Sequence, residues 1–406
     1  MNVIIAQSGG PTSVINSSLA GAIEGGIDND FNRIYLSNNG IEGILKEHIE
    51  EVDQEIFAKD NCGKKLMARP SSILGSCRYK LSDDLDHPDY AKIFEVLRKN
   101  AIDLFIYIGG NDSMDTVTKL NKYMVEKKIE DIHVIGCPKT IDNDLMGMDH
   151  SPGYGSAAKY IASTIRTIRT DVDIYDLESV TFVEIMGRHA GWLAASSLVS
   201  NHKAKKDQVN LLYIPEDEKY LDDIFDEIKE ALKAENNLII ALAEGFRDLE
   251  DKLNEEVFSN SKDGFNHPVV AGVGERLATM VRERLGVKSR AIELNTVQRT
   301  NTLISKTDAE EAYKLGYRAT ELGIDHTNLV PVLRRSNNDN YEVTYTEVKP
   351  SEIANREMMI PVDWLGDKKI LEEKMINYCL PLIQGEIAQT YQDGMPVFIE
   401  KEDFIK

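Results

Sequence analysis

Residues 132–144 read IHVIGCPKTIDND, an apolar run that changes at Pro138 into polar residues and two aspartates. The apolar part is short and contains several β-branched residues, which is typical of a buried strand. In parallel sheets covered on both faces, strands have continuous apolar character and ligands bind beyond their carboxyl ends. The stretch therefore indicates an α/β fold and places a candidate site directly after this strand.

The same pattern recurs along the chain. Seven further apolar runs stop at small or polar residues, namely 2–10, 33–40, 103–112, 179–188, 209–217, 237–246 and 290–295. Helical patterns lie between them, and the clearest covers residues 218–235. Its apolar residues fall on one stripe, formed by Leu221, Ile224, Phe225, Ile228 and Leu232. This alternation predicts parallel sheets with helices on both faces. The polar stretches 259–267 and 335–341 are expected to be surface loops.

Composition limits the classes of partner. A chain of 406 residues predicts two or three domains. The formal charge of −21 disfavours nucleic acid and anionic lipid as partners, since both would be repelled. No secretory signal or run of transmembrane length is visible, and the four cysteines form no CxxC pair. We expect a cytoplasmic protein.

Two glycine pairs each follow an apolar run. Gly9 and Gly10 precede a helical stretch, and Gly109 and Gly110 precede Asn111 and a second helical stretch. Glycines let a backbone approach phosphate closely, and a helix N-terminus attracts anions. Each pair alone is equally well explained as a tight turn or a helix cap. The chain has no G-x-x-x-x-G-K-[ST] motif, which excludes an ordinary P-loop.

The aspartates of PKTIDND are the strongest catalytic candidates. Asp142 and Asp144 lie two residues apart, so that both can face one way in an extended segment. One carboxylate can then remove a proton from a hydroxyl while the other holds a metal ion. The structural alternative is an Asx turn, which accounts for one aspartate but poorly for the cluster. Arg188, after the run 179–188, is a candidate phosphate ligand, although a single arginine is often only a solvated surface residue.

Taken in order, seven motifs resemble those of the phosphofructokinase family. They are SGGPTSVIN (8–16), LGSCRY (74–79), GGNDS (109–113), PKTIDND (138–144), VEIMGRHAGW (183–192), AEGF (243–246) and the stretch from Arg290 to Arg299. The resemblance implies two Rossmann-like, doubly wound parallel-sheet lobes with the active site in the cleft between them. It also implies more than one crossing of the chain. We expect residues 1–155 plus about 298–350 to form the donor-binding lobe, and 156–297 plus about 351–406 the lobe that binds fructose 6-phosphate.

The resemblance also implies roles for single residues. Asp142 would be the general base, with Thr140, Asp144 and Arg188 completing the catalytic group. The donor would be bound by Gly10, Arg78, Asp112 and Lys139. The sugar phosphate would be bound by Thr140, Asp142, Met186, Gly187, Arg188, Glu244, Arg290 and Arg299. Arg290 would reach in from a neighbouring subunit of a homodimer or homotetramer. Mg²⁺ is the implied cofactor, with Asp112 as its ligand.

Two departures from the ATP-using bacterial pattern resemble the pyrophosphate-dependent members. GGNDS replaces GGDGS, so Asp112 stands where a glycine is usual, and Lys139 replaces the second glycine of PGTIDND. At about 4 Å and an effective dielectric constant of about 20, the charge of Asp112 would oppose an α-phosphate by roughly 4 kcal/mol. Lys139 would bind a short inorganic donor. We therefore predict diphosphate–fructose-6-phosphate 1-phosphotransferase activity.

Alternatives remain open at this point. The first is an ATP-dependent 6-phosphofructokinase. A non-catalytic regulatory subunit is a second, because Asn111 occupies a position that in relatives carries a carboxylate associated with Mg²⁺. A protein related to NAD kinases or lipid kinases is a third. Ser179 and Thr296 also depart from the family pattern, at positions where arginine and histidine are common.

Overall fold

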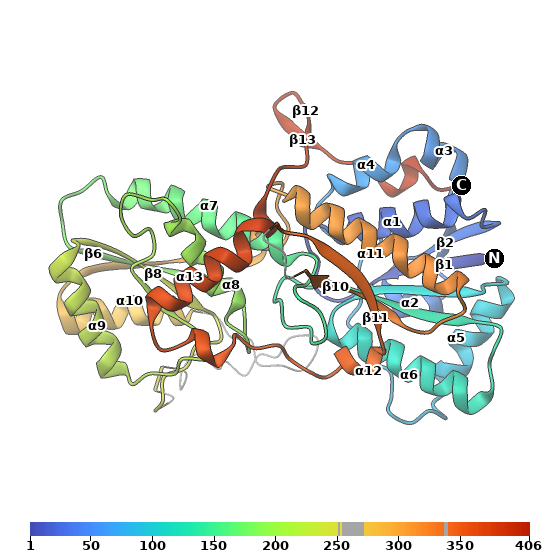
Figure 1. Ribbon diagram of the computed structural model, residues 1–406, viewed down its shortest axis with the longest axis horizontal. Coiled ribbons are helices and arrows are strands. Elements are labelled where there is room, and N and C mark those ends of the chain that lie inside the picture. Colours follow the sequence, from blue (N-terminus) through green and yellow to red (C-terminus); the bar gives the residue numbers. More distant parts are fainter. Residues whose placement is uncertain (251, 254–271, 337–339) are drawn as a thin grey trace.

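The computed structural model describes residues 1–250, 252–253, 272–336 and 340–406. The chain forms two lobes that lie side by side, each built around its own β-sheet (Figure 1). Both the α/β class and the two-lobed arrangement predicted from the sequence are confirmed.

The first lobe contains a five-stranded sheet in the order β3-β2-β1-β4-β5. Its strands are β1 (Asn2–Gln7), β2 (Arg33–Ser37), β3 (Ile49–Glu51), β4 (Leu104–Gly109) and β5 (His133–Pro138). Neighbouring strands are parallel except β3, which runs antiparallel to β2. Along β1, Val3 and Ile5 belong to the core on one face, and Ile4 and Ala6 to the core on the other. Both faces of this sheet are therefore covered.

Helices from distant parts of the sequence cover that sheet. They are α1 (Ile15–Asp28), α2 (Gly40–Leu45), α3 (Gln54–Lys59), α4 (Cys62–Met67), α5 (Pro88–Lys99), α6 (Asn111–Lys127), α11 (Lys306–Ile324) and α12 (Pro350–Ile353). Helix α11 packs closely against α1 (Figure 1). A Cβ atom at Gly21 of α1 would lie 1.9 Å from the carbonyl oxygen of Tyr313, so this contact requires glycine.

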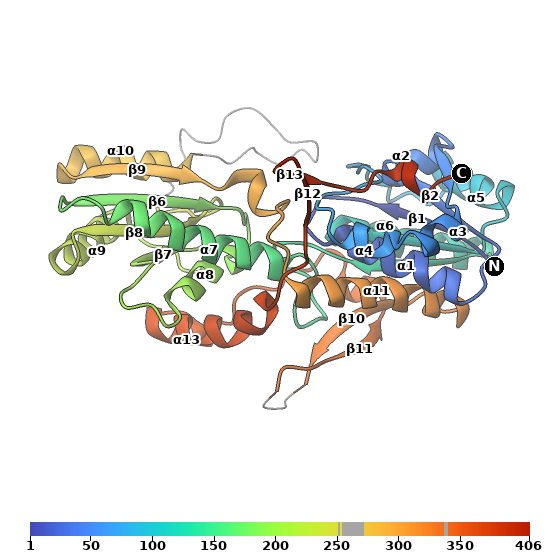
Figure 2. The same cartoon turned by 90° about the horizontal axis from the view of Figure 1, so that it is seen from above.

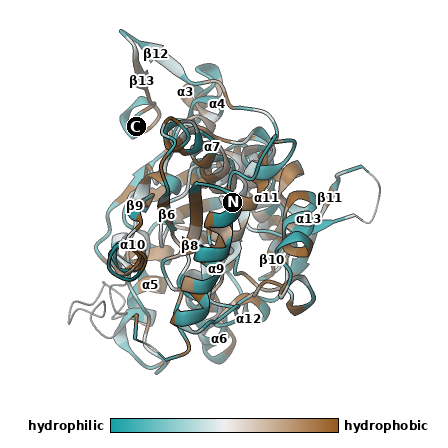
Figure 3. Ribbon diagram, turned by 90° about the vertical axis from the view of Figure 1, so that its left-hand side faces the viewer, coloured by the Kyte–Doolittle hydropathy of each residue, from teal (hydrophilic) through white to brown (hydrophobic). Residues whose placement is uncertain are grey.

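The second lobe contains a four-stranded, fully parallel sheet in the order β7-β8-β6-β9. Its strands are β6 (Ser179–Ile185), β7 (Leu211–Tyr213), β8 (Asn237–Ala243) and β9 (Lys288–Glu293). Its helices are α7 (Tyr154–Val172), α8 (Trp192–Ser196), α9 (Leu221–Ala234), α10 (Val273–Leu285) and α13 (Lys368–Cys379). In Figure 3 strands β6 and β8 are apolar while α9 presents a polar outer face. The predicted apolar stripe of this helix is buried.

All eight apolar runs of the sequence contain a strand. Two antiparallel hairpins were not predicted. One pairs β10 (Val330–Arg335) with β11 (Val343–Val348) and projects from the first lobe (Figure 2). The other pairs β12 (Thr390–Gln392) with β13 (Met395–Val397). Of the loop expected at 335–341, Arg335 belongs to β10, Ser336, Asn340 and Tyr341 lie outside helices and strands, and residues 337–339 are outside the described residues. The loop expected at 259–267 lies outside the described residues.

Short 3₁₀ helices complete the structure. They are η1 (Ser197–Asn201), η2 (Asn295–Gln298), η3 (Val362–Trp364), η4 (Leu380–Ile383) and η5 (Lys401–Asp403). Across the described part of the chain, no helix combines the length and the apolar character that a membrane crossing requires.

The expected assignment of residues 351–406 to the second lobe needs a correction. Helix α13 does pack in the second lobe's core through Leu371 and Met375. By contrast, Ile353 and Phe404 are buried in the first lobe, where the ring of Phe404 meets that of Phe57 edge-on at 5.5 Å. The apolar side chains at the two ends of this segment thus belong to the first lobe, and the chain crosses between lobes more often than the division assumed.

Candidate active site

A cleft of about 630 Å³ lies between the two lobes, at the carboxyl ends of strands from both sheets. The loops after β1, β4 and β5 line it from the first lobe, and the loops after β6 and β8 line it from the second. Most predicted site residues line this cleft: Gly10, Arg78, Asp112, Lys139, Thr140, Asp142, Asp144, Met186, Arg188, Glu244 and Arg299. Residues separated by up to 289 positions are brought together, since the list runs from residue 10 to residue 299.

The two aspartates of the loop after β5 share the cleft. Burial raises the pKa of Asp142 above its ordinary value, although Lys139 and Arg188 oppose this rise. Burial, together with the charge of Asp142, raises the pKa of Asp144 to about 7. The hydroxyl of Thr140 accepts a hydrogen bond from the backbone N–H of Asp142 at 3.1 Å. The raised pKa values bring proton uptake by this pair close to neutral pH, which is the range in which a carboxylate can accept a proton from a hydroxyl efficiently.

Lys139 lines the cleft beside the glycine turn after β1. Its side chain is 2% exposed, and its Nζ donates a hydrogen bond to the carbonyl oxygen of Gly10 at 2.7 Å. Gly9 has φ +74°, and a Cβ there would come within 3.1 Å of this Nζ. The glycine pair after β1 therefore leaves the space that the lysine fills. Burial lowers the pKa of Lys139 to about 8, and the charge of Asp142 partly offsets this effect.

Two arginines add to the positive charge beside the glycine turn. A Cβ at Gly10 would lie 3.6 Å from Nη1 of Arg299. Burial lowers the pKa of the Arg299 guanidinium, and the nearby charge of Arg78 lowers it further. Nε of Arg299 is buried and makes no hydrogen bond to any described residue. Like charges gathered around a polar cleft are stabilised when a polyanion binds between them.

The opposite end of the cleft is formed by the second lobe. Gly187 has φ +129°, a conformation that favours glycine, and its carbonyl oxygen accepts a hydrogen bond from the N–H of Gly245 at 3.0 Å. This turn brings Arg188 to Glu244, with 3.5 Å between Nε and Oε1. Burial raises the pKa of Glu244 to about 7, against the opposing charge of Arg188. Gly187 shapes the site through its backbone and is not itself among the lining residues.

Arg290 is the predicted site residue that this chain does not bring to its own cleft. It lies on β9 opposite Thr181, and its Nη2 donates to Oδ2 of Asp171 at 2.7 Å. Its side chain is 50% exposed. It lines a separate hollow of about 80 Å³ together with Ser179. A role for Arg290 in catalysis would require a second copy of the chain, so its shared-site role stays a prediction.

Asn111 and Asp112 begin α6, and both line the cleft. Asp112 is exposed at the cleft. Asn111 instead holds the segment after α12: its Nδ2 donates to the carbonyl oxygen of Arg356 at 2.8 Å, and its Oδ1 accepts from the N–H of Asn355 at 2.6 Å. Both polar atoms of the amide are thereby used in a structural contact.

Several carboxylates of the cleft are candidate ligands for a metal ion. Within the described ranges, no group of three or more His, Cys, Asp or Glu side chains is placed to hold an ion. Mg²⁺ in phosphoryl-transfer sites is commonly held by one or two carboxylates plus substrate phosphates. Five carboxylates among the described residues line the cleft, and one or two of Asp112, Asp142 and Asp144 could serve in that kind of binding.

Residues that the sequence did not single out as site residues also line the cleft, among them Lys80, His189, Asn355 and Glu357. Nδ1 of His189 lies 2.7 Å from Oε1 of Glu357, so that a contact joins the two lobes across the cleft. The two-residue spacing of Lys80 from Arg78 is a signal that could have identified it. Asn355 and Glu357 follow no strand or glycine turn, and no sequence signal marks them.

Comparison with known proteins agrees with this geometry. The model of the family described as phosphofructokinase matches residues 2–323. The chain belongs to the phosphofructokinase family. A relative from Halomonas elongata, named pyrophosphate–fructose 6-phosphate 1-phosphotransferase, is 35% identical over 97% of this chain and 94% of that protein. A relative from Alkalicoccus urumqiensis named sulfofructose kinase is 32% identical over 92% of this chain and 94% of that protein.

A solved phosphofructokinase has the same fold along the whole chain. The crystal structure titled pyrophosphate-dependent phosphofructokinase from Nitrosospira multiformis superimposes with a TM-score of 0.85 at 31% identity, covering 100% of this chain and 97% of that one. The relation therefore includes the C-terminal hundred residues that carry none of the family motifs.

Proposed function

We propose that this phosphofructokinase transfers a phosphoryl group from pyrophosphate to the 1-hydroxyl of fructose 6-phosphate, giving fructose 1,6-bisphosphate and phosphate. The observation that carries the proposal is the buried Lys139, which fills the space beside Gly9 and Gly10 at the donor end of the cleft. The name of the Halomonas elongata relative, which the chain matches over nearly its full length, supports the same donor and acceptor.

In the proposed reaction Asp142 accepts the proton of the sugar 1-hydroxyl, whose oxygen then forms a bond to the terminal phosphorus of pyrophosphate. The bond from that phosphorus to the bridging oxygen breaks, and inorganic phosphate leaves. Arg78, Lys139 and Arg299 hold the phosphate oxygens in place, because phosphoryl transfer depends mainly on positioning and charge neutralisation. Mg²⁺ bound at the cleft carboxylates and the diphosphate would neutralise negative charge that develops on the donor.

Donor choice follows from two side chains on either side of this subsite. Asp112 places a carboxylate at the N-terminus of α6, where the remainder of a nucleotide would have to pass. Lys139 supplies a compact positive charge suited to a short, highly charged donor. The energy of the pyrophosphate bond is modest, and we propose that the reaction is reversible.

We further propose that the active enzyme is a homodimer or homotetramer in which Arg290 completes the sugar-phosphate site of a neighbouring subunit. Its half-exposed position away from the chain's own cleft supports this arrangement. The test is to mix inactive Arg290→Ala and inactive Asp142→Asn chains under conditions of subunit exchange. Hybrid oligomers should regain activity, whereas continued inactivity after demonstrated exchange would rule out a shared site.

The proposed function is tested by a coupled assay of the purified protein with Mg²⁺ and fructose 6-phosphate, with pyrophosphate and ATP supplied in separate reactions. Sulfofructose replaces the sugar phosphate in a third reaction, because one relative bears the name sulfofructose kinase. We expect turnover with pyrophosphate and fructose 6-phosphate, and a loss of about 10²- to 10⁴-fold in kcat for Asp142→Asn. Turnover confined to ATP or to sulfofructose would contradict the proposal.

A further inference from the structure

The loop between β5 and α7 carries both cleft aspartates and is closed at its base. Thr140 forms an isolated bridge with Gly153, and the N–H of Thr140 donates to the carbonyl oxygen of Pro152 at 3.1 Å. Residues 141–152 therefore leave the sheet and return to nearly the same point. The direction in which Asp142 and Asp144 point depends on how the interior of this loop is held.

Asn143 lies between the two aspartates and points the other way. It is fully buried and has φ +57°, whereas Asp142 and Asp144 both line the cleft. Its Oδ1 accepts a hydrogen bond from the N–H of Ser151 at 2.9 Å, and its Nδ2 donates to the hydroxyl of Tyr378 at 2.9 Å. Two hydrogen bonds, one at each polar atom of the amide, thus fix the left-handed turn at Asn143. The fixed turn holds the flanking aspartates toward the cleft.

Tyr378 is the contribution of α13 to this arrangement. Its hydroxyl accepts from Asn143 and donates to the carbonyl oxygen of Asp149 at 2.7 Å. One oxygen atom therefore joins the outgoing and the returning part of the loop. The ring is fixed by Trp192, with centroids 5.2 Å apart, and by the guanidinium of Arg335 at 4.8 Å. Because these contacts fix the ring, they also fix the position of the Tyr378 hydroxyl.

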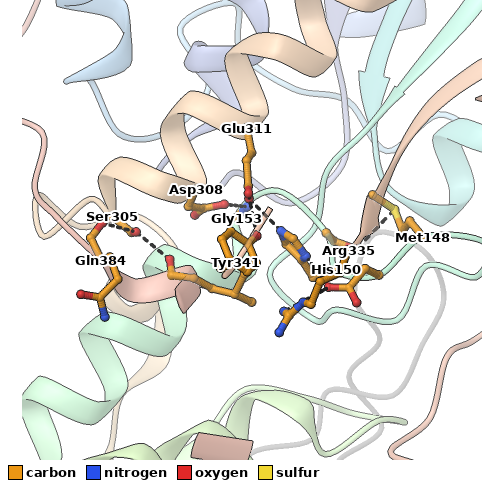
Figure 4. A network of polar contacts seen from close by, with 12 residues as sticks. Met148, His150, Gly153, Ser305, Asp308, Glu311, Arg335, Tyr341 and Gln384 are labelled. Atoms are coloured by element: carbon orange, nitrogen blue, oxygen red, sulfur yellow. Dashed lines mark hydrogen bonds and ion pairs between the residues drawn. The ribbon is translucent and has the colours of Figure 1, made fainter. Parts of the chain in front are cut away.

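The returning part of the loop is anchored by a buried ionic network (Figure 4). His150 is 1% exposed, and its two ring nitrogens each lie 2.8 Å from a carboxylate, Nδ1 from Asp149 and Nε2 from Glu311 of α11. Glu311 also accepts from the hydroxyl of Tyr341 at 2.6 Å, and Asp149 accepts from Nε of Arg335 at 3.1 Å. Parts of the chain far from the family motifs, from α11 through β10 to Tyr341, thereby fix the loop.

From these contacts we propose that Tyr378 is a positioning residue, which acts through Asn143 to orient the catalytic carboxylates Asp142 and Asp144. The inference rests on the proposed function for the role of these carboxylates. The C-terminal region would thus support the active site, because its helix α13 carries the tyrosine hydroxyl. Since the hydroxyl touches neither cleft nor substrate groups, its effect should appear in the chemical step rather than in substrate affinity.

The test is Tyr378→Phe, which removes one oxygen atom and keeps the ring. We expect kcat to fall at least tenfold while KM for pyrophosphate and for fructose 6-phosphate changes less than twofold. The matched control is Tyr313→Phe, which removes a hydroxyl that donates to Glu24 in the first lobe and should leave kcat unchanged. A kcat equal to wild type, or a change in KM with kcat intact, overturns the proposal.

A second variant keeps the proposal testable if Tyr378→Phe folds poorly. Asn143→Gly tolerates the positive φ and deletes the amide that the hydroxyl holds. By itself this variant should lower kcat at least tenfold and change both KM values less than twofold, and an unchanged kcat would overturn the proposal. Where Tyr378→Phe does fold, the double variant should lose little more than Asn143→Gly alone, because the connection is already broken. Additive losses would show that the two residues act separately. Absence of pyrophosphate-dependent turnover in the wild-type protein would instead refute the proposed function.

Discussion

At the scale of single residues, the cleft combines groups whose ordinary pKa values are moved toward neutrality. Burial raises the pKa of Asp144 and of Glu244 to about 7 and lowers that of Lys139 to about 8. All three changes have the same cause, namely loss of water around the charged form. The site is therefore expected to be active in a narrow pH range.

The first prediction concerns this range. Below pH about 7 the aspartate pair takes up a proton and can no longer serve as base, and above pH about 8 Lys139 loses the charge that binds the donor. kcat/KM for pyrophosphate at saturating fructose 6-phosphate should therefore be bell-shaped, because it reports the groups of the enzyme before the donor binds. The measurement is a pH profile of this parameter.

The affinity for fructose 6-phosphate provides the control, since Lys139 lies at the donor end. The dissociation constant for fructose 6-phosphate should stay constant between pH 7.5 and 9, whereas that for pyrophosphate should rise. A flat profile for pyrophosphate across pH 8 would show that the charge of Lys139 is not used.

At the scale of elements, the strands were predictable and the segment after α12 was not. Continuous apolar runs such as 237–246 predict a buried strand from local sequence alone, without knowledge of the tertiary contacts. The backbone of residues 355–357 is held at the cleft in part by Asn111, and a contact across more than 240 positions leaves no local pattern. Three of the four hairpin strands, β11, β12 and β13, are short or alternate with polar residues, so that they give no clear strand pattern.

The second prediction tests this contact. Asn111→Asp removes the donor to the carbonyl oxygen of Arg356, so hydrogen exchange at residues 354–358 should become faster. Because Asn111 is not oriented as a metal ligand, the variant should not bind Mg²⁺ more tightly than wild type. Exchange by mass spectrometry and a Mg²⁺ titration of activity measure the two effects. The control is Asn121→Asp, on the same helix and away from the cleft. Mg²⁺ affinity raised tenfold or more would mean that position 111 is a metal site.

At the scale of the whole molecule, the lobes are joined by segments that cross between them several times. The network around His150 connects the loop after β5 with α11 and with residues around β10 and β11. The family motifs, which end near Arg299, predicted the lobes and the cleft well. They could not predict the role of residues 351–406, because the positions of Ile353, Tyr378 and Phe404 depend on tertiary packing alone.

The third prediction concerns stability. Although burial opposes it, hydrogen bonds to Asp149 and Glu311 raise the pKa of His150 to about 9 from an ordinary value of 6.5. The folded state therefore holds a proton that the unfolded state releases. The resulting stabilisation, about 3 kcal/mol, is fully present below pH 6.5 and is lost as pH rises through 9.

Urea denaturation of wild type and His150→Gln at pH 6 and pH 9 measures this effect. The difference in free energy of unfolding between the two proteins should be larger at pH 6 than at pH 9. Comparing the two proteins cancels the contribution of Lys139, whose lowered pKa changes stability in the opposite sense above pH 8. A difference that does not depend on pH would indicate a neutral imidazole at position 150.

The central claim is that Asp112 and Lys139 make this phosphofructokinase a pyrophosphate-dependent enzyme. The most direct test is to measure kcat/KM for ATP and for pyrophosphate in wild type, Asp112→Gly, Lys139→Gly and the double variant. We predict that Asp112→Gly gains measurable use of ATP, that Lys139→Gly mainly loses use of pyrophosphate, and that the ratio of ATP to pyrophosphate rises by several orders of magnitude in the double variant. The two effects should not be additive, because both side chains act on one subsite. ATP use that stays undetectable in Asp112→Gly, together with unchanged pyrophosphate use in Lys139→Gly, would contradict the account.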